Sequence, residues 1–214
     1  MLVLAVDTST PAVTAGLVAL DDSGHRVLAT RLTVDARAHA ELLTPHIMEC
    51  LAESGSVPAD LDAVVVGVGP GPFTGLRVGM ATAAGFADAL HIPVYGICSL
   101  DAIAHQVGPD RELLVVTDAR RREVYWARYR DGVRFDGPGV EKPSALEVGS
   151  AAVIAGSPSH VDLFDVPVEP VESPSALGLV LPLAAAILSG AAPEPIVPLY
   201  LRRPDAVEQA ARAR

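Results

Sequence analysis

Four polar residues directly after the first predicted strand are the part of this sequence best suited to bind a ligand. Residues 2–6 form an apolar run typical of a buried strand, and next come Asp7, Thr8, Ser9 and Thr10. A carboxylate with neighbouring hydroxyls at such a turn can bind the phosphates and metal of a nucleotide. The same residue types also hydrogen-bond their own backbone in ordinary turns. The turn lacks a phosphate-binding glycine and Pro11 follows it, so plain turn chemistry is favoured while nucleotide binding stays open.

A turn rich in glycine and proline, residues 69–75, offers a second place for an anion. It lacks the Gly-Lys-Ser/Thr ending of a Walker motif and the third glycine of a dinucleotide fingerprint. Thr74 is suited to cap the following helix, whose N-terminus can attract an anion. However, Pro70 and Pro72 remove N–H donors from the turn. We therefore interpret it as a rigid connection rather than an anion site.

Metal coordination and nucleophilic catalysis find no support in the residue spacing. His39 and His46 lie seven apart, whereas two histidines of one helix usually chelate a metal from positions i and i+4. No Gly-x-Ser-x-Gly elbow occurs, and neither Cys50 nor Cys98 has a histidine close by in sequence. We expect no catalytic residue, no metal site and no cofactor. The charged turn 118–123 is either a solvated hairpin tip or a binding element between two halves of the fold.

Composition limits the possible partners and compartment. The chain has 214 residues, with 16 basic against 26 acidic side chains and a net charge of −10. A nucleic-acid-binding protein that acts alone normally has the opposite sign, so any RNA contact would need another subunit. Two cysteines and no secretory leader indicate a reducing, cytoplasmic location. The uncharged stretch between Glu172 and Glu194 contains prolines and glycines, which favours a buried helix over a membrane span.

The elements that position these residues follow the same order twice. Three strands (2–6, 13–20, 27–34) precede helix 36–54, strand 63–68, helix 74–90, strand 93–97 and helix 99–107. A weaker copy has strands 112–118, 122–130, 133–141 and 151–155, then helix 175–189. This order predicts mixed sheets flanked by helices on both faces, in two related lobes spanning 1–104 and 105–214. The second lobe is smaller and degenerate, and we expect the tail after Pro204 to fray.

Two of the predicted helices, 36–54 and 74–90, have the character of an interaction surface. Gly75, Gly79 and Ala83 are four residues apart and leave one stripe of their helix nearly without side chains. Packing in the core explains such a stripe, and so does close approach of another chain. We predict a docking face made by His39, Leu42, Leu43, Ile47, Gly75, Leu76, Gly79, Met80 and Ala83. A leucine at Gly79 should then abolish docking without unfolding the chain.

Several segments together resemble the TsaB (YeaZ) family, the accessory proteins of tRNA threonylcarbamoyladenosine biosynthesis. The matching segments are 4–10, 38–45, 69–79, 99–102, 118–127 and 198–202. The likeness is strong over the first half and intermittent over the second. It implies an actin-like, ribonuclease-H-like (ASKHA) α/β fold.

The resemblance also implies a non-catalytic role. In the catalytic paralogue TsaD two histidines hold a metal, and Ser99 and Ile103 stand at the corresponding positions here. Such a chain would bind a TsaD-like paralogue, work with a TsaE-like ATPase, and reach tRNA indirectly through the complex. It could also form a homodimer through helices 36–54 and 74–90, and no membrane is involved. The alternatives are a protease-like hydrolase and an actin-like ATPase acting alone.

Overall fold

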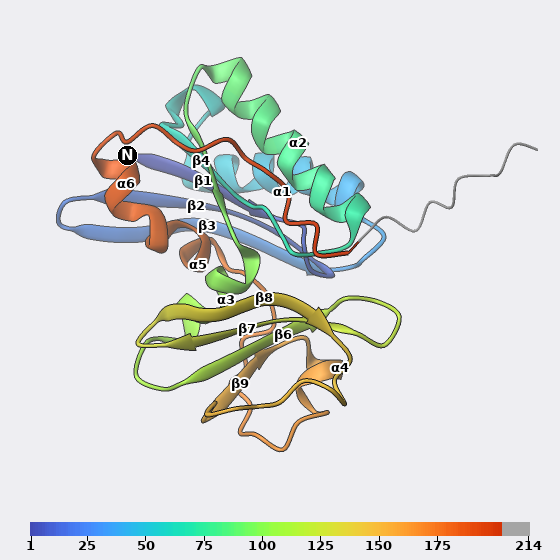
Figure 1. The fold of residues 1–214 in the computed structure, drawn as a ribbon. Coiled ribbons are helices and arrows are strands. Elements are labelled where there is room, and N and C mark those ends of the chain that lie inside the picture. The colour runs from blue at the N-terminus through green and yellow to red at the C-terminus, as the bar shows by residue number, and fades with distance from the viewer. Residues whose placement is uncertain (203–214) are drawn as a thin grey trace, which may run out of the picture.

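The computed structural model describes residues 1–202, which form two mixed β-sheets with helix α3 between them (Figure 1). The first sheet has the strand order β3-β2-β1-β4-β5. These strands are β1 (Leu2–Asp7), β2 (Ala12–Asp21), β3 (Gly24–Val34), β4 (Ala63–Gly67) and β5 (Val94–Ile97). β2 runs antiparallel to β1 and β3, whereas β1, β4 and β5 are parallel. The carboxyl ends of three parallel strands therefore meet at one edge of this sheet.

The second sheet repeats the connectivity of the first on a smaller scale. Its order is β8-β7-β6-β9, with β6 (Leu113–Asp118), β7 (Val124–Arg130), β8 (Val133–Glu141) and β9 (Val153–Gly156). β6 pairs antiparallel with β7 and parallel with β9, as β1 does with β2 and β4. This arrangement confirms the expected α/β class with two sheets flanked by helices.

Helix α3 (Ser99–Val107) contacts the cores of both sheets. Ala102 belongs to the cluster on the first sheet, whereas Leu100 and Ile103 belong to the cluster on the second. The lobe boundary between residues 104 and 105 therefore falls within a shared helix, and it remains a proposal.

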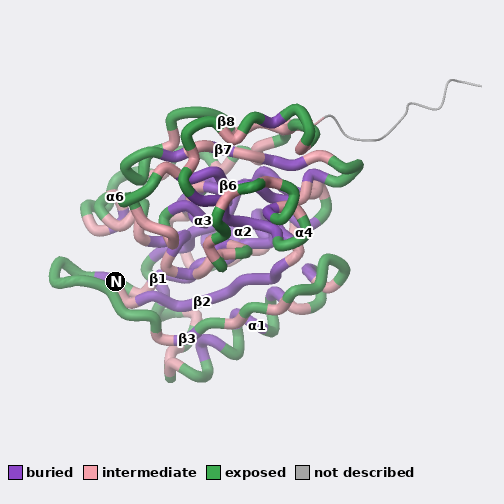
Figure 2. The backbone as a smooth tube through the Cα atoms, turned by 90° about the horizontal axis from the view of Figure 1, so that it is seen from below, coloured by how far each residue is buried: buried purple, intermediate pink, exposed green. Residues whose placement is uncertain are grey.

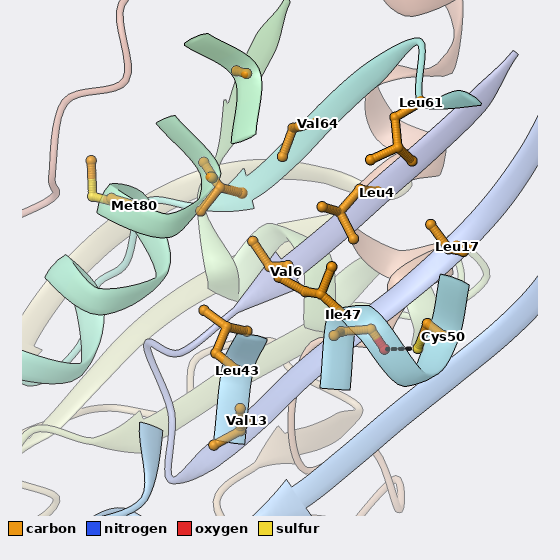
Figure 3. Close-up of a cluster of buried hydrophobic side chains, with 14 of the residues drawn as sticks. Leu4, Val6, Val13, Leu17, Leu43, Ile47, Cys50, Leu61, Val64 and Met80 are labelled. Carbon is orange, nitrogen blue, oxygen red and sulfur yellow. Dashed lines mark hydrogen bonds between the residues drawn. The ribbon is translucent and has the colours of Figure 1, made fainter. Parts of the chain in front are cut away.

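Side-chain alternation along the strands gives the first sheet two apolar faces. One face is covered by α1 (His39–Ser54) and α2 (Phe73–Leu90), and there Leu4, Val6 and Ile47 pack among other fully buried side chains (Figure 3). The opposite face is covered by α5 (Ala176–Val180), η2 (Leu181–Leu183) and α6 (Ala184–Leu188). A segment of the predicted second half thus completes the first sheet. β1 and much of β2 are buried, while α1 alternates between buried and exposed positions (Figure 2).

Some sequence-based expectations need correction. The prediction of a single helix over 175–189 is wrong. Pro182 interrupts this segment, which forms α5, η2 and α6 instead. Thr74 does not cap α2, because the helix begins one residue earlier with Pro72 at the N-cap. α1 begins at His39, three residues after the start expected at residue 36, and continues through Pro45.

The remaining elements are short, namely η1 (Pro58–Asp60) and α4 (Pro158–Val161). Among residues 1–202, no helix combines the length and apolar character needed to cross a membrane. The tail after Pro204 lies outside the described residues.

Candidate functional site

The carboxylate of Asp7 is enclosed at the carboxyl edge of the first sheet. Its Oδ1 accepts a hydrogen bond from the Ser9 backbone N–H at 2.9 Å, and its Oδ2 accepts one from the Ser99 hydroxyl at 2.6 Å. Gly67 ends the neighbouring strand β4, and a Cβ there would lie 1.7 Å from Oδ2. Burial raises the pKa of Asp7, because desolvation disfavours the charged form more than these hydrogen bonds favour it.

This raised pKa gives a testable pH dependence. The folded state holds the Asp7 proton more tightly than the unfolded chain, so its contribution to stability is present at low pH and is lost as pH rises through the folded-state pKa. An asparagine can accept from Ser9 and donate to Ser99 without charge. The melting temperature of Asp7→Asn should therefore lie several degrees above that of the wild type at pH 8. In a chain of this length, each kcal/mol of unfolding free energy shifts the melting temperature by about 2–4 °C. Thermal unfolding measured from pH 4 to 8 should show a difference in melting temperature between Asp7→Asn and the wild type that grows with pH. A difference that stays constant with pH would contradict the raised pKa of Asp7.

Thr8 is held by α2 rather than presented to a ligand. Its hydroxyl donates to the Gly75 carbonyl at 2.7 Å and accepts from the Gly79 N–H at 2.9 Å. A Cβ on Gly79 would lie 2.4 Å from Thr8 Oγ1, and one on Gly75 would lie 2.7 Å from the Thr8 carbonyl oxygen. The glycine stripe thus allows α2 to lie directly against the turn after β1.

This contact corrects the predicted docking face. Eight of its nine residues are buried within the chain, namely His39, Leu43, Ile47, Gly75, Leu76, Gly79, Met80 and Ala83. Only Leu42 is partly exposed. The structure gives a different expectation for a leucine at Gly79, namely a destabilised fold, because the space beside Gly79 is occupied by Thr8 of the same chain.

The two predicted histidines bind groups of their own chain. His39 Nε2 lies 2.9 Å from the Thr10 carbonyl oxygen, and His46 Nε2 lies 2.9 Å from the Thr33 hydroxyl. The paralogue's metal-binding positions are also occupied by internal contacts, since Ser99 donates to Asp7 and Ile103 is fully buried. Within residues 1–202, no three histidine, cysteine or acidic side chains gather as a metal site would require.

An open cavity of about 330 Å³ lies between the first sheet's helices and the second sheet. The turn after β1, the starts of α1 and α2, and the turn between β6 and β7 contribute its walls. Of the four nucleotide candidates, only Thr10 lines it, and all four are almost completely buried. Asp118 and Arg120 line it from the second sheet.

The turn between β6 and β7 has an unusual backbone. Three consecutive arginines, Arg120, Arg121 and Arg122, adopt φ angles of 61°, 54° and 60°. Non-glycine residues seldom adopt this left-handed conformation, and such strained positions cluster at functional sites. The sequence showed the charged turn but carried no sign of this geometry.

Residues 190–202 form a C-terminal strap that connects the first sheet to this turn. The Leu199 N–H donates to the Val68 carbonyl at 2.8 Å, and Arg202 donates to the Ala119 carbonyl at 2.8 Å and pairs with Glu123. The Tyr200 ring stacks on Phe73 at 4.9 Å. Sequence reasoning missed these contacts, because a short segment without periodicity carries no signal of what it touches.

The comparisons with known proteins agree on one family. A family model described as "TsaD: tRNA N6-adenosine threonylcarbamoyltransferase" matches residues 28–148. An uncharacterized protein of Mycobacterium tuberculosis strain H37Rv is 58% identical over 204 residues, which cover 95% of this chain and 93% of that protein. The Escherichia coli protein named "tRNA threonylcarbamoyladenosine biosynthesis protein TsaB" is 35% identical over 134 residues, which cover 61% of this chain and 55% of that protein. The structure of YeaZ from Pseudomonas aeruginosa matches with a TM-score of 0.74 and 30% identity, covering 94% of this chain and 99% of that one.

Proposed function

Because the chain belongs to the TsaB (YeaZ) family, we propose that it acts in tRNA threonylcarbamoyladenosine biosynthesis as a non-catalytic subunit. In this proposal it binds a TsaD-like catalytic paralogue, works with a TsaE-like ATPase and reaches tRNA through the complex. The single observation that carries the proposal is the closed carboxyl edge of the first sheet. There Asp7 and Thr8 are buried and their polar atoms bind their own chain.

The closed edge argues against both enzymatic alternatives. An actin-like ATPase would need the turn after β1 open to phosphates, whereas Thr8 binds α2. A hydrolase would need an activated nucleophile. Burial raises the pKa of both cysteine thiols to about 11, which keeps them protonated and poorly reactive near neutral pH.

The outer surface of α1 and α2 is the surface we propose for docking. Met48 is 47% exposed on α1, and Thr44 lies one turn earlier on the same side. On α2, Ala81 and Gly85 are exposed and also four residues apart. Small and apolar exposed residues on adjacent helices suit close packing against a second helix pair. A homodimer through the same surface is the corresponding proposal for the isolated chain.

Reconstitution of the transfer reaction from purified subunits tests this proposal. Threonylcarbamoylated tRNA should form at least tenfold more when this chain and the TsaD-like paralogue are both present than with the paralogue alone. The chain alone should hydrolyse neither ATP nor peptides above background, and robust turnover in either assay would contradict a non-catalytic role.

A further inference from the structure

Exposed arginines lie on the segments that form the walls of the cavity between the sheets, in a chain whose net charge is −10. Arg37 and Arg120 line the cavity, and Arg122 lies in the same turn as Arg120. Arg77 lies on α2 between Phe73 and Val78, which both line the cavity. We call these four residues (Arg37, Arg77, Arg120 and Arg122) the arginine rim.

Three of the four arginines in the rim differ from most other described arginines, because they have no acidic partner among residues 1–202. Elsewhere guanidinium groups pair with carboxylates, as in Arg31–Glu49, Arg111–Glu169, Arg128–Asp136, Arg130–Glu112 and Arg134–Asp101. Within residues 1–202, Arg37, Arg77 and Arg122 have no carboxylate at ion-pair distance, and Arg120 lies 3.7 Å from Asp118. Asp118 lines the same cavity and Asp35 accepts a hydrogen bond from the Arg37 backbone N–H, so among residues 1–202 the positive charge of the rim is compensated only in part.

Aromatic surface adjoins the arginine rim. The Arg77 guanidinium lies 3.6 Å from the centre of the Phe73 ring, and its Nε donates to the Tyr200 hydroxyl at 2.8 Å. Tyr200 is 39% exposed. Exposed guanidinium groups beside aromatic rings are typical of surfaces that bind single-stranded nucleic acid, where cations neutralise phosphates and rings stack on bases.

The layout of the rim favours an extended anion over a small one. A single phosphate is usually held by donors that converge on one point, whereas these side chains are exposed and come from three separate segments. The inner wall offers no substitute, because Asp7 and Thr8 are sealed by their own chain. An extended polyanion, unlike a single phosphate, can contact guanidinium groups that stand on separate segments.

We propose that the arginine rim binds the phosphate backbone of RNA. The proposal rests on the proposed function, because the chain's own charge opposes RNA binding until a partner contributes positive surface. The tRNA of the complex is then a direct contact of this subunit and not only of its partner.

Salt-dependent binding of an unmodified tRNA transcript tests this proposal. The transcript carries adenosine beside the anticodon, and the complex of this chain with its TsaD-like paralogue is titrated by fluorescence anisotropy. The variant is Arg37→Gln, Arg77→Gln and Arg122→Gln combined. Each lost phosphate contact lowers the slope of log K against log salt by about 0.7, so the triple variant should lower it by about 2 and weaken binding about tenfold. A second variant combines only Arg37→Gln and Arg122→Gln, and so keeps the aromatic contacts of Arg77. It should lower the slope of log K against log salt by about 1.4.

Arg26→Gln is the matched control. Arg26 is also exposed and without a carboxylate at ion-pair distance among the described residues, but it lies on β3 away from the cavity lining. Its loss should leave affinity and slope unchanged. Co-purification of the paralogue is measured in parallel and should be unaffected in Arg26→Gln and in the pair Arg37→Gln and Arg122→Gln. Arg77 lies one helical turn before Ala81 of the proposed docking surface, so the pair decides the proposal if the triple variant loses the paralogue.

Each other outcome has a distinct meaning. Wild-type affinity and slope in the folded arginine variants would overturn the proposal. Loss of the paralogue together with the tRNA in the pair Arg37→Gln and Arg122→Gln would show that the rim contacts protein, which also overturns the proposal. If the wild-type chain retains no paralogue at all, the proposed function fails instead.

Discussion

Replacing Gly79 with leucine should destabilise the fold by about 3 kcal/mol, because the space that a side chain needs there is already filled. Even a Cβ would lie 2.4 Å from Thr8 Oγ1, and the Gly79 N–H donates to that same oxygen. The larger side chain must separate α2 from the turn after β1 and break this hydrogen bond. Urea unfolding followed by circular dichroism measures the loss.

Gly85 provides a control on the same helix. Apart from its chain neighbours and the backbone of its own helix, no atom lies within 4 Å of the position that its Cβ would take, and the residue is exposed. Gly85→Leu should therefore stabilise the fold by a few tenths of a kcal/mol up to about 1 kcal/mol, since leucine has the higher helix propensity. Equal effects at Gly79 and Gly85 would contradict the role assigned to the glycine stripe.

The second large effect is expected at the proposed docking surface. Met48→Glu combined with Ala81→Glu places two carboxylates where the proposal has apolar helices in contact. Burying unpaired charge in such a contact costs several kcal/mol, which should reduce affinity for the TsaD-like paralogue by 100-fold or more. Co-purification and titration calorimetry measure this loss, while an unchanged thermal transition shows that the variant is folded.

Leu163→Glu is the control for this experiment. Leu163 is 58% exposed in the loop after α4, so the substitution replaces an exposed apolar side chain with one carboxylate, half the charge added by the double variant, at a site distant in sequence from both helices. It should bind the paralogue as the wild type does. Full binding by the folded Met48 and Ala81 variant would place the interface elsewhere.

The sequence predicted the order of the elements well, because apolar periodicity depends on which face of a strand or helix is buried. Helix α3 and strand β8 have the residues expected for them, and the strands of both sheets differ from expectation by a few residues at their ends. The region 175–189 was predicted poorly. Its composition suits a helix, but Pro182 divides it, and the fold uses the pieces to cover the first sheet.

The candidate site was predictable in its location but not in its chemistry. The turn after β1 was identified from Asp7 and the hydroxyl residues, yet the Ser99–Asp7 hydrogen bond joins residues 92 positions apart and had no local sign. The glycine stripe was recognised as a place of close approach. Its partner could not be chosen between the core and another chain, because a glycine that admits another chain and one that admits Thr8 look the same in a sequence.

The most direct test of the central claim is the amount of threonylcarbamoyladenosine formed in tRNA by purified components. The assay combines the TsaD-like paralogue, the TsaE-like ATPase, unmodified tRNA and the activated threonylcarbamoyl donor, with this chain added or withheld. We predict no product from this chain without the paralogue, and at least tenfold more product when both are present than with the paralogue alone. Product formed by this chain without the paralogue, or undiminished product when this chain is withheld, would contradict the account.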